Sequence, residues 1–217
     1  DEYAAAYEEL RNKNWEDTES GYSIQFNWDI LARGNQSRPD GPYGPCIKPD
    51  GFFVAKTRLR LRSSTDECDR SIYPDPTVTS AFVLPINWFA GYQKRAETNP
   101  ERFSNFNSGD VVVAYRSGGQ NRPPVWVYGV VGDAGPFSKL GEATVAFNRQ
   151  LRRSDAAVKT YRQALALDTA SLSPREIGFA VFEGSAPELK RDYSPANIRK
   201  AGEQRLAAWM DGALDKA

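Results

Sequence analysis

The sequence contains no histidine, and this absence removes several kinds of chemistry. Histidine is the usual general base beside a Ser or Cys nucleophile and the commonest metal ligand in proteins. Without it, the side chains that titrate nearest to neutral pH are carboxylates, so acid–base catalysis would fall to Asp and Glu. A zinc site would have to combine two cysteines with carboxylates, which is not a usual ligand set. We therefore expect neither a metal nor another cofactor.

An excess of charge and a long apolar run are also missing. Lys and Arg together number 28, as do Asp and Glu, so the formal net charge is zero. No long-range attraction to nucleic acid or to an anionic membrane surface is therefore built into the chain as a whole. No stretch approaches the ~20 apolar residues of a membrane helix. We expect a monomer that binds neither nucleic acid nor membrane.

The chain has only two cysteines, Cys46 and Cys68, and each lies beside turn-forming residues. Two free thiols would be the ordinary state in the cytosol, whereas a disulfide is typical of an oxidising compartment. The polar, exposed surroundings expected for both residues favour the disulfide. The sequence starts at Asp1 without a charged and apolar leader, which fits a signal peptide that has been removed or trimmed. We therefore predict a Cys46–Cys68 disulfide in a secreted protein, extracellular or periplasmic.

Hydrophobic periodicity predicts a chain of strands with helices near both ends. The expected strands cover residues 52–61, 78–88, 110–115, 125–131 and 177–182, and 142–147 is either a strand or the opening of a helix. The expected helices cover residues 1–15, a segment capped by Ser154, and a final segment that starts at Ser194-Pro195. The apolar face of the final helix would be Ile198, Ala201, Leu206, Trp209 and Met210.

These elements predict an α+β protein that is mainly β with peripheral helices. Residues 1–32 would form an N-terminal helix and a lead-in segment, and the stretch 33–51, rich in Gly and Pro, a long loop. Strand character returns at residues 177–182, so the last third of the chain should complete the same core. We therefore expect one catalytic, β-rich domain over residues 33–217, barrel-like in shape.

Two acidic residues mark the segment with the clearest chemical pattern. Asp133 follows a very apolar strand, and Glu142 comes nine positions later, after a turn that contains Gly135, Pro136 and Gly141. Two carboxyl groups that face each other across a few ångströms are what glycoside hydrolysis requires. The same residues are also ordinary turn and surface residues, so the spacing alone does not decide between catalysis and structure.

A resemblance to a known family adds weight to the catalytic interpretation. The segments 133–136 and 141–144 resemble the D-x-G-P and G-E-(A/V)-S elements of the fungal-type chitosanases, glycoside hydrolase family 75, and their bacterial relatives. In that family the Asp and the Glu are the catalytic pair, and Thr144 stands where Ser is usual. Similar family elements follow the same order at 51–57, 73–75, 82–85, 109–110 and 179–185, with Glu183 in place of Pro.

The resemblance implies an inverting hydrolase of a β-linked amino-sugar polymer, with Asp133 and Glu142 as acid and base. By analogy with other paired-carboxylate enzymes, the barrel would be of the double-psi type. The family's Asp-rich N-terminal stretch has no clear match here, since Asp29 and Asp40 are only candidates. Two alternatives therefore remain: an enzyme that acts on peptidoglycan or another glycan, and a catalytically silent domain that binds carbohydrate or a partner.

Several further residues are candidates for contact with a polysaccharide or oligosaccharide substrate. Lys56 and Thr57 end an expected strand and could reach a sugar, and Tyr73 and Asp75 belong to a family-like element. All four are equally explained as surface or loop residues. Acidic subsites for a polycation would come from Asp66, Asp69 and Asp75. A stacking platform for sugar rings would come from Trp88, Phe89, Tyr92, Trp126 and Tyr128, although Trp126 and Tyr128 are also expected in the core.

Overall fold

The computed structural model describes most of the chain from residue 54 onward. The described residues are 12, 32, 46, 54–89, 105–118, 123–136, 140–159, 163–164, 166–167 and 177–214. Contacts divide the chain into two compact units, Asp1–Tyr73 and Pro74–Ala217, which are described separately. Almost none of the helix predicted over residues 1–15 or of the loop predicted over 33–51 belongs to the described residues, and Tyr92 lies outside them. The domain boundary predicted after residue 32 stays a prediction.

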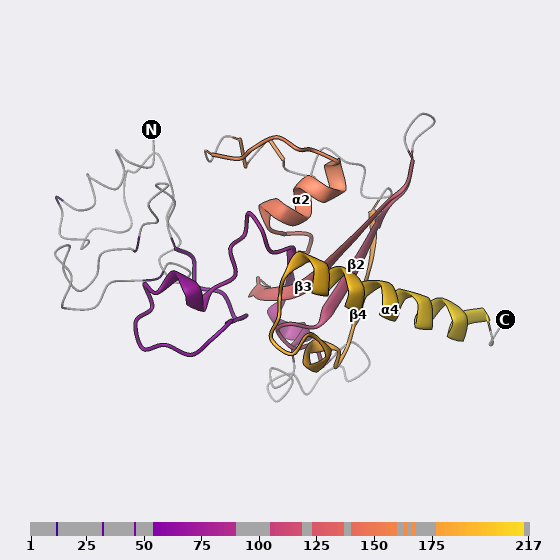
Figure 1. Cartoon of the computed structure of the whole chain (residues 1–217), viewed down its shortest axis with the longest axis horizontal. Coiled ribbons are helices and arrows are strands. Elements are labelled where there is room, and N and C mark those ends of the chain that lie inside the picture. The colour runs from indigo at the N-terminus through magenta and orange to yellow at the C-terminus, as the bar shows by residue number, and fades with distance from the viewer. Residues whose placement is uncertain are drawn as a thin grey trace. The chain divides into compact units, whose positions relative to one another are not determined.

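Unit Pro74–Ala217 is built on a mixed sheet of four strands (Figure 1). The strands are β1 (Ala81–Pro85), β2 (Val111–Arg116), β3 (Val125–Gly135) and β4 (Ile177–Phe182), in the order β1-β3-β2-β4. β1 is parallel to β3, whereas β2 is antiparallel to both β3 and β4. The α+β class is confirmed. The predicted barrel is wrong for the described residues, because β1 and β4 stand at opposite ends of an open sheet.

Helices cover both faces of this sheet. On one face, Phe147 and Leu151 of α2 (Val145–Arg152) pack into the main apolar core with side chains of β1, β2 and β3. On the other, α4 (Pro195–Leu214) lies so close to β3 that a Cβ at Gly202 would come within 2.4 Å of the Tyr128 ring. Strands covered on both faces read as continuous apolar runs, which explains the Val-Val-Val-Ala sequence of β2.

The last third of the chain completes this core, as predicted. β4 pairs with β2 along its whole length, from Val111↔Phe182 to Arg116↔Ile177. Phe179 of β4 packs on Phe82 of β1, with the ring centres 5.0 Å apart. No helix in the described ranges is long and apolar enough to cross a membrane.

The final helix starts at the predicted residue, but its predicted apolar face is only half right. Ile198 and Ala201 are buried, whereas Trp209 and Met210 are 58% and 50% exposed. Toward its C-terminus α4 runs on beyond the sheet (Figure 1), so the second half of its apolar face has no strand beneath it. Periodicity shows which residues share a face, but not how far the opposing surface extends.

Two other predicted elements are placed differently in the structure. Of the two alternatives for residues 142–147, the helix is the correct one: α2 starts at Val145 and ends at Arg153 in a left-handed conformation. The helix expected from Ser154 does not start there, since residues 154–159 are not helical, although residues 163–164 within its expected span are. The strand expected over residues 52–61 is absent from its described part. There the backbone N–H of Leu61 donates to Ile72 O in an irregular loop, so the alternating sequence lacks a continuous partner strand.

In unit Asp1–Tyr73, Cys46 and Cys68 form the predicted disulfide, with their Cα atoms 5.4 Å apart. The expected exposure of the two residues is wrong, because Cys46 is 1% and Cys68 is 6% exposed. Both belong to a small apolar cluster that also contains Val54 and Ile72. The disulfide therefore lies inside the small core of this unit, which short irregular segments form around it.

Candidate active site

Asp133 and Glu142 lie on either side of one residue of β1. Val83 is the register partner of Asp133 in the parallel β1–β3 pair. On its other side, the backbone N–H of Val83 donates to Glu142 O at 2.9 Å, and Phe82 forms an antiparallel bridge with Ala143. The sequence predicts that the two acidic residues face each other. In the structure, β1 is the element between them.

The register also places both acidic side chains on the same face of the sheet. Side chains of register partners share a face, and successive residues of a strand alternate. Ala134 and Ala143, which follow each acidic residue, both pack against the apolar core. Asp133 and Glu142 must therefore point to the opposite face, which is the face of Val83. The extra residue at the register shift between Phe82 and Val83 sets this alternation, because it reverses the faces of the residues of β3 that follow it.

The Cα separation that follows from this arrangement is compatible with the carboxyl separation of an inverting hydrolase. Neighbouring strands are ~4.8 Å apart, so residues on either side of one strand have Cα atoms ~9–10 Å apart. Inverting glycosidases hold their two carboxyl groups ~6.5–9.5 Å apart, which leaves space for a water molecule. Glu142 is exposed and Asp133 is half-buried, so both residues have access to solvent.

Glycines on either side of Asp133 in β3 keep this part of the sheet surface free of side chains. A Cβ at Gly132 would lie 2.7 Å from Ala81 Cβ, and one at Gly135 would lie 2.9 Å from Val83 Cγ1. Neither position can carry a side chain without a shift of its neighbour. The half-buried Val83 therefore separates Asp133 from Glu142 with no larger side chain of these strands between them.

Local backbone features fix the orientation of each acidic residue. Asp133 accepts a hydrogen bond from Ala134 N at 2.8 Å on its Oδ1 atom. Glu142 follows Gly141, whose φ of 104° lies in a region that residues with a side chain rarely adopt. No atom would touch a Cβ at Gly141, so the glycine is needed for its backbone conformation alone. This turn returns the chain to the edge of β1.

The hydroxyl of Thr144 ties the Glu142 segment to β1. Thr144 Oγ1 accepts from Ala81 N at 3.0 Å and donates to Thr79 O at 2.9 Å. The same oxygen caps α2 by accepting from Phe147 N. The family-like Ser or Thr is thus explained as a structural clamp two residues from Glu142. A Thr directly before a helical segment is the sequence signal for this helix cap, which the prediction for residues 142–147 does not include.

Replacing Thr144 with Val should lower kcat about ten- to a hundredfold, whereas Thr144→Ser should keep most of the activity. Val has nearly the same shape but cannot make these hydrogen bonds, so Ala81 N and Thr79 O lose a partner. A shift of Glu142 by about 1 Å is enough for such a loss. Steady-state kinetics beside thermal unfolding would measure both effects. A Val variant with parental kcat would contradict this role.

Two other family-like elements meet in the structure at a buried junction. The Asp110 carboxylate, which is fully buried, accepts from Asn107 N at 2.8 Å and from Ala186 N at 3.0 Å. In return, Ser185 Oγ accepts from Val111 N at 2.7 Å. These bonds join the start of β2 to the end of β4. The resemblance alone gives no indication of this structural role.

Lys56, Thr57 and Tyr73, which are predicted to contact substrate, lie in unit Asp1–Tyr73. Lys56 Nζ is 3.7 Å from a carboxylate oxygen of Glu67, and Thr57 Oγ1 donates to Leu59 O at 2.8 Å. Tyr73 is only 5% exposed, and burial raises the pKa of its phenol. Its hydroxyl oxygen is buried and has no hydrogen-bond partner among the described residues. Substrate contact by these three residues stays a prediction.

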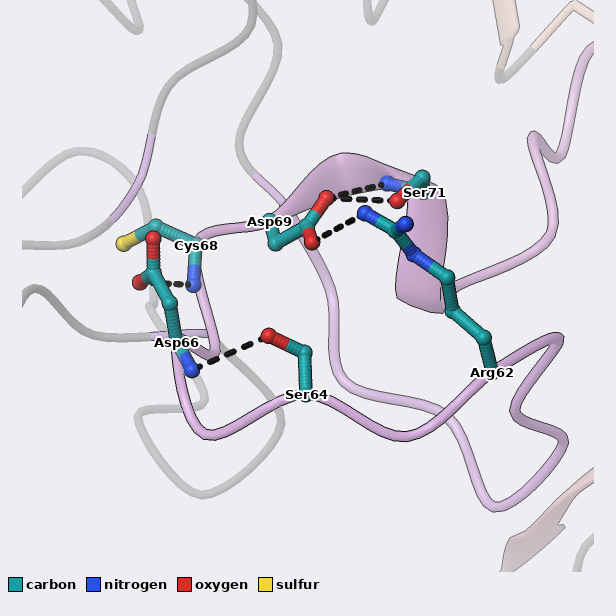
Figure 2. Close-up of polar contacts among 6 residues, drawn as sticks. All are labelled: Arg62, Ser64, Asp66, Cys68, Asp69 and Ser71. Carbon is teal, nitrogen blue, oxygen red and sulfur yellow. Dashed lines mark hydrogen bonds and ion pairs between the residues drawn. The ribbon is translucent and has the colours of Figure 1, made fainter.

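The acidic residues considered as subsites each support a local turn. Figure 2 shows Asp66 accepting from Cys68 N at 3.0 Å, and Asp69 accepting from both the backbone and the hydroxyl of Ser71 and pairing with Arg62. The Ser71 hydroxyl, which donates to Asp69, lowers the pKa of that carboxyl. Asp75 is exposed in the same unit as Asp133, and accepts from Thr77 N and Oγ1 at 2.8 and 2.7 Å. A role in substrate binding stays a prediction for all three residues.

The aromatic residues proposed as a stacking platform separate into different environments. Phe89 is buried, and Trp88 packs on Phe106 with the ring centres 6.3 Å apart. Tyr128 lies beneath Gly202 of α4. Trp126 is 42% exposed. The predicted platform is therefore not a single surface, and Trp126 is its most exposed described member.

Comparison with known proteins gives no family assignment. No protein-family model matches the chain, and no curated protein matches its sequence.

Proposed function

We propose that this chain is a secreted glycoside hydrolase that cleaves a β-linked amino-sugar polymer, chitosan-like in chemistry, with inversion at the anomeric carbon. The observation that carries the proposal is the placement of Asp133 and Glu142 on one face, on either side of Val83. This spacing leaves room for a water molecule between one carboxylate and a bound sugar. The Cys46–Cys68 disulfide is compatible with secretion.

In the proposed mechanism Glu142 is the acid and Asp133 is the base. Glu142 donates its proton to the glycosidic oxygen as the bond to the anomeric carbon breaks. Asp133 accepts a proton from a water molecule whose oxygen attacks that carbon from the opposite side, so the configuration inverts. Glu has the longer side chain and the slightly higher reference pKa, which suits the acid. The N–H of Ala134 holds the Asp133 carboxylate as an acceptor, which suits the base.

We further propose that the chain is related to the family 75 chitosanases. Support comes from the order of the short family-like elements and from the structural use of four of them. The clamp at Thr144, the junction at Asp110 and Ser185, and the glycines beside Asp133 each have a physical role in the structure. The double-psi type, which was predicted for a closed barrel, is not confirmed, because the described strands form an open sheet.

The choice of polymer depends on local charge. The chain is neutral overall, so a polycationic substrate must be attracted by nearby carboxylates. Asp75 lies in the same unit as the catalytic pair and is exposed. Unlike chitin and cellulose, chitosan carries a protonated amine on most of its sugars. An exposed acidic residue in the same unit as the pair therefore favours chitosan.

A reducing-sugar assay against chitosan, chitin, cellulose and peptidoglycan would test the proposal. We expect release from chitosan above that from the other three polymers. Release of reducing sugar from peptidoglycan alone would show that the enzyme cleaves a glycan other than chitosan. No release from any of the four, with binding to one of them retained, would identify a silent carbohydrate-binding domain instead.

A further inference from the structure

Three residues form a row across the sheet at the end remote from Asp133. Trp126 of β3 is the register partner of Tyr115 of β2, and Tyr115 is the register partner of Gly178 of β4. The Trp126 and Tyr115 rings contact each other, with centres 4.7 Å apart and planes at 49°. Because register partners share a face, both rings and the open side of Gly178 lie on one surface.

This row is open to solvent within a sheet that is otherwise largely buried. Trp126 is 42% exposed, Tyr115 is half-buried and Gly178 is exposed. Among the described residues, apart from Gly178 and its two chain neighbours, no atom lies within 4 Å of the position that a Cβ at Gly178 would occupy. Tyr115 therefore lies between the Trp126 ring and an open step, one residue wide, at Gly178.

A purely structural explanation accounts for the rings but not for the glycine. Cross-strand aromatic pairs stabilise a sheet by ~0.2–1 kcal/mol, so the contact between Tyr115 and Trp126 needs no further reason. A glycine inside a strand weakens that strand, and it usually marks a bulge, a sharp bend or the close approach of another molecule. The pairing of β4 is regular through Gly178, and its φ is not positive. The described residues show no bulge, positive φ or neighbouring atom that requires this glycine, so the space above it is open to another molecule.

The row is separate from the candidate active site. Trp126 and Asp133 are seven residues apart on β3, which corresponds to ~23 Å along a strand. Between them, Gly202 of α4 covers Tyr128. A sugar bound at Trp126 would thus not be the sugar that is cleaved.

We propose that Trp126, Tyr115 and Gly178 form a second carbohydrate-binding site, which holds one pyranose ring of the polymer. The C–H groups of a pyranose face carry partial positive charge, and the face of an aromatic ring is negative. A sugar can therefore lie across Trp126 and Tyr115, with one edge toward the open step at Gly178, while its hydroxyl groups stay in water. The identification of the ligand as a sugar of the polymer rests on the proposed function. The argument from aromatic stacking is independent of that function.

Affinity electrophoresis in gels containing soluble chitosan would test this site. The full-length chain would carry Asp133→Asn throughout, so that the polymer stays intact. Trp126→Ala should weaken binding roughly tenfold, the loss expected for one aromatic stacking contact with its buried area. Gly178→Val should weaken binding comparably with both rings present, because its side chain fills the step. Trp209→Ala removes another exposed tryptophan, on α4, and should leave the affinity unchanged.

Each outcome decides the proposal. Parental affinity in Trp126→Ala, or an equal loss in Trp209→Ala, would overturn it. Sedimentation of the parent as a dimer that Trp126→Ala converts to a monomer would identify the row as a self-association surface, which also overturns it. Failure of the proposed function is distinguishable, because it appears as absence of reducing-sugar release by the Asp133 parent, while binding that depends on Trp126 would persist.

Discussion

Asp133→Asn and Glu142→Gln should each lower the rate of polymer hydrolysis by about 10²–10⁴-fold, because each removes one proton transfer from the reaction. The amides keep the shape of the side chains, so substrate binding and folding should change little. Initial rates of reducing-sugar release would measure the effect. Proton NMR of the freshly released ends should show the inverted anomer in the parent protein.

Matched controls separate this effect from a general loss of charge. Asp155→Asn and Glu203→Gln change the same residue types at exposed positions outside the candidate site, and both should retain parental rates. Thermal unfolding should show that the two site variants remain folded. Full activity in both site variants would end the hydrolase proposal at this site. A loss in one variant only would assign a single essential carboxyl group and remove the paired mechanism.

The sequence predicts those parts of the fold whose signal is local. β2 and β3 are runs of β-branched and aromatic residues, and each forms within a few residues of its predicted bounds. The start of α4 at Ser194-Pro195 has a direct physical cause, since Pro at the first helical position loses no hydrogen bond. The helix α2 is predicted only as one of two alternatives for residues 142–147, because it is short and carries four polar residues, Asn148, Arg149, Gln150 and Arg152, among its eight.

The parts that the sequence does not predict depend on pairing between distant segments. Asp133 and Glu142 are recognisable as a pair by their spacing and their flanking glycines. That they share a face, however, is decided by Val83 and by the register shift beside it, about 50 residues earlier in the chain. No local pattern around residue 83 indicates which strands will lie beside it. The open sheet, found where a barrel was expected, has the same cause, because local propensity does not specify which strands form the edges.

Asp110→Ala should lower the free energy of unfolding by about 3 kcal/mol, since it leaves two part-buried backbone N–H groups without an acceptor. The Asp110 carboxylate is fully buried and accepts hydrogen bonds from Asn107 N and Ala186 N at 2.8 and 3.0 Å. Asp110→Asn keeps one carbonyl oxygen and should cost less than the Ala variant. Urea unfolding would measure both, and equal stability of the Ala variant and the parent would contradict this role.

The Asp110→Ala substitution should also change the candidate site, because backbone hydrogen bonds connect residues 109–110 with β3. The carbonyl of Asp110 accepts from Val131 N at 2.8 Å, and Gly109 N donates to Val131 O at 2.7 Å, so this junction holds β3 two residues before Asp133. Ser185→Ala removes the bond that Ser185 Oγ accepts from Val111 N and the bond that it donates to Phe182 O, but leaves both bonds to the Asp110 carboxylate, and serves as the control. At a temperature where every variant is folded, we expect Asp110→Ala to lose more activity than Ser185→Ala. An Asp110→Ala variant that is destabilised but keeps the parental kcat would show that the junction supports the sheet without positioning Asp133.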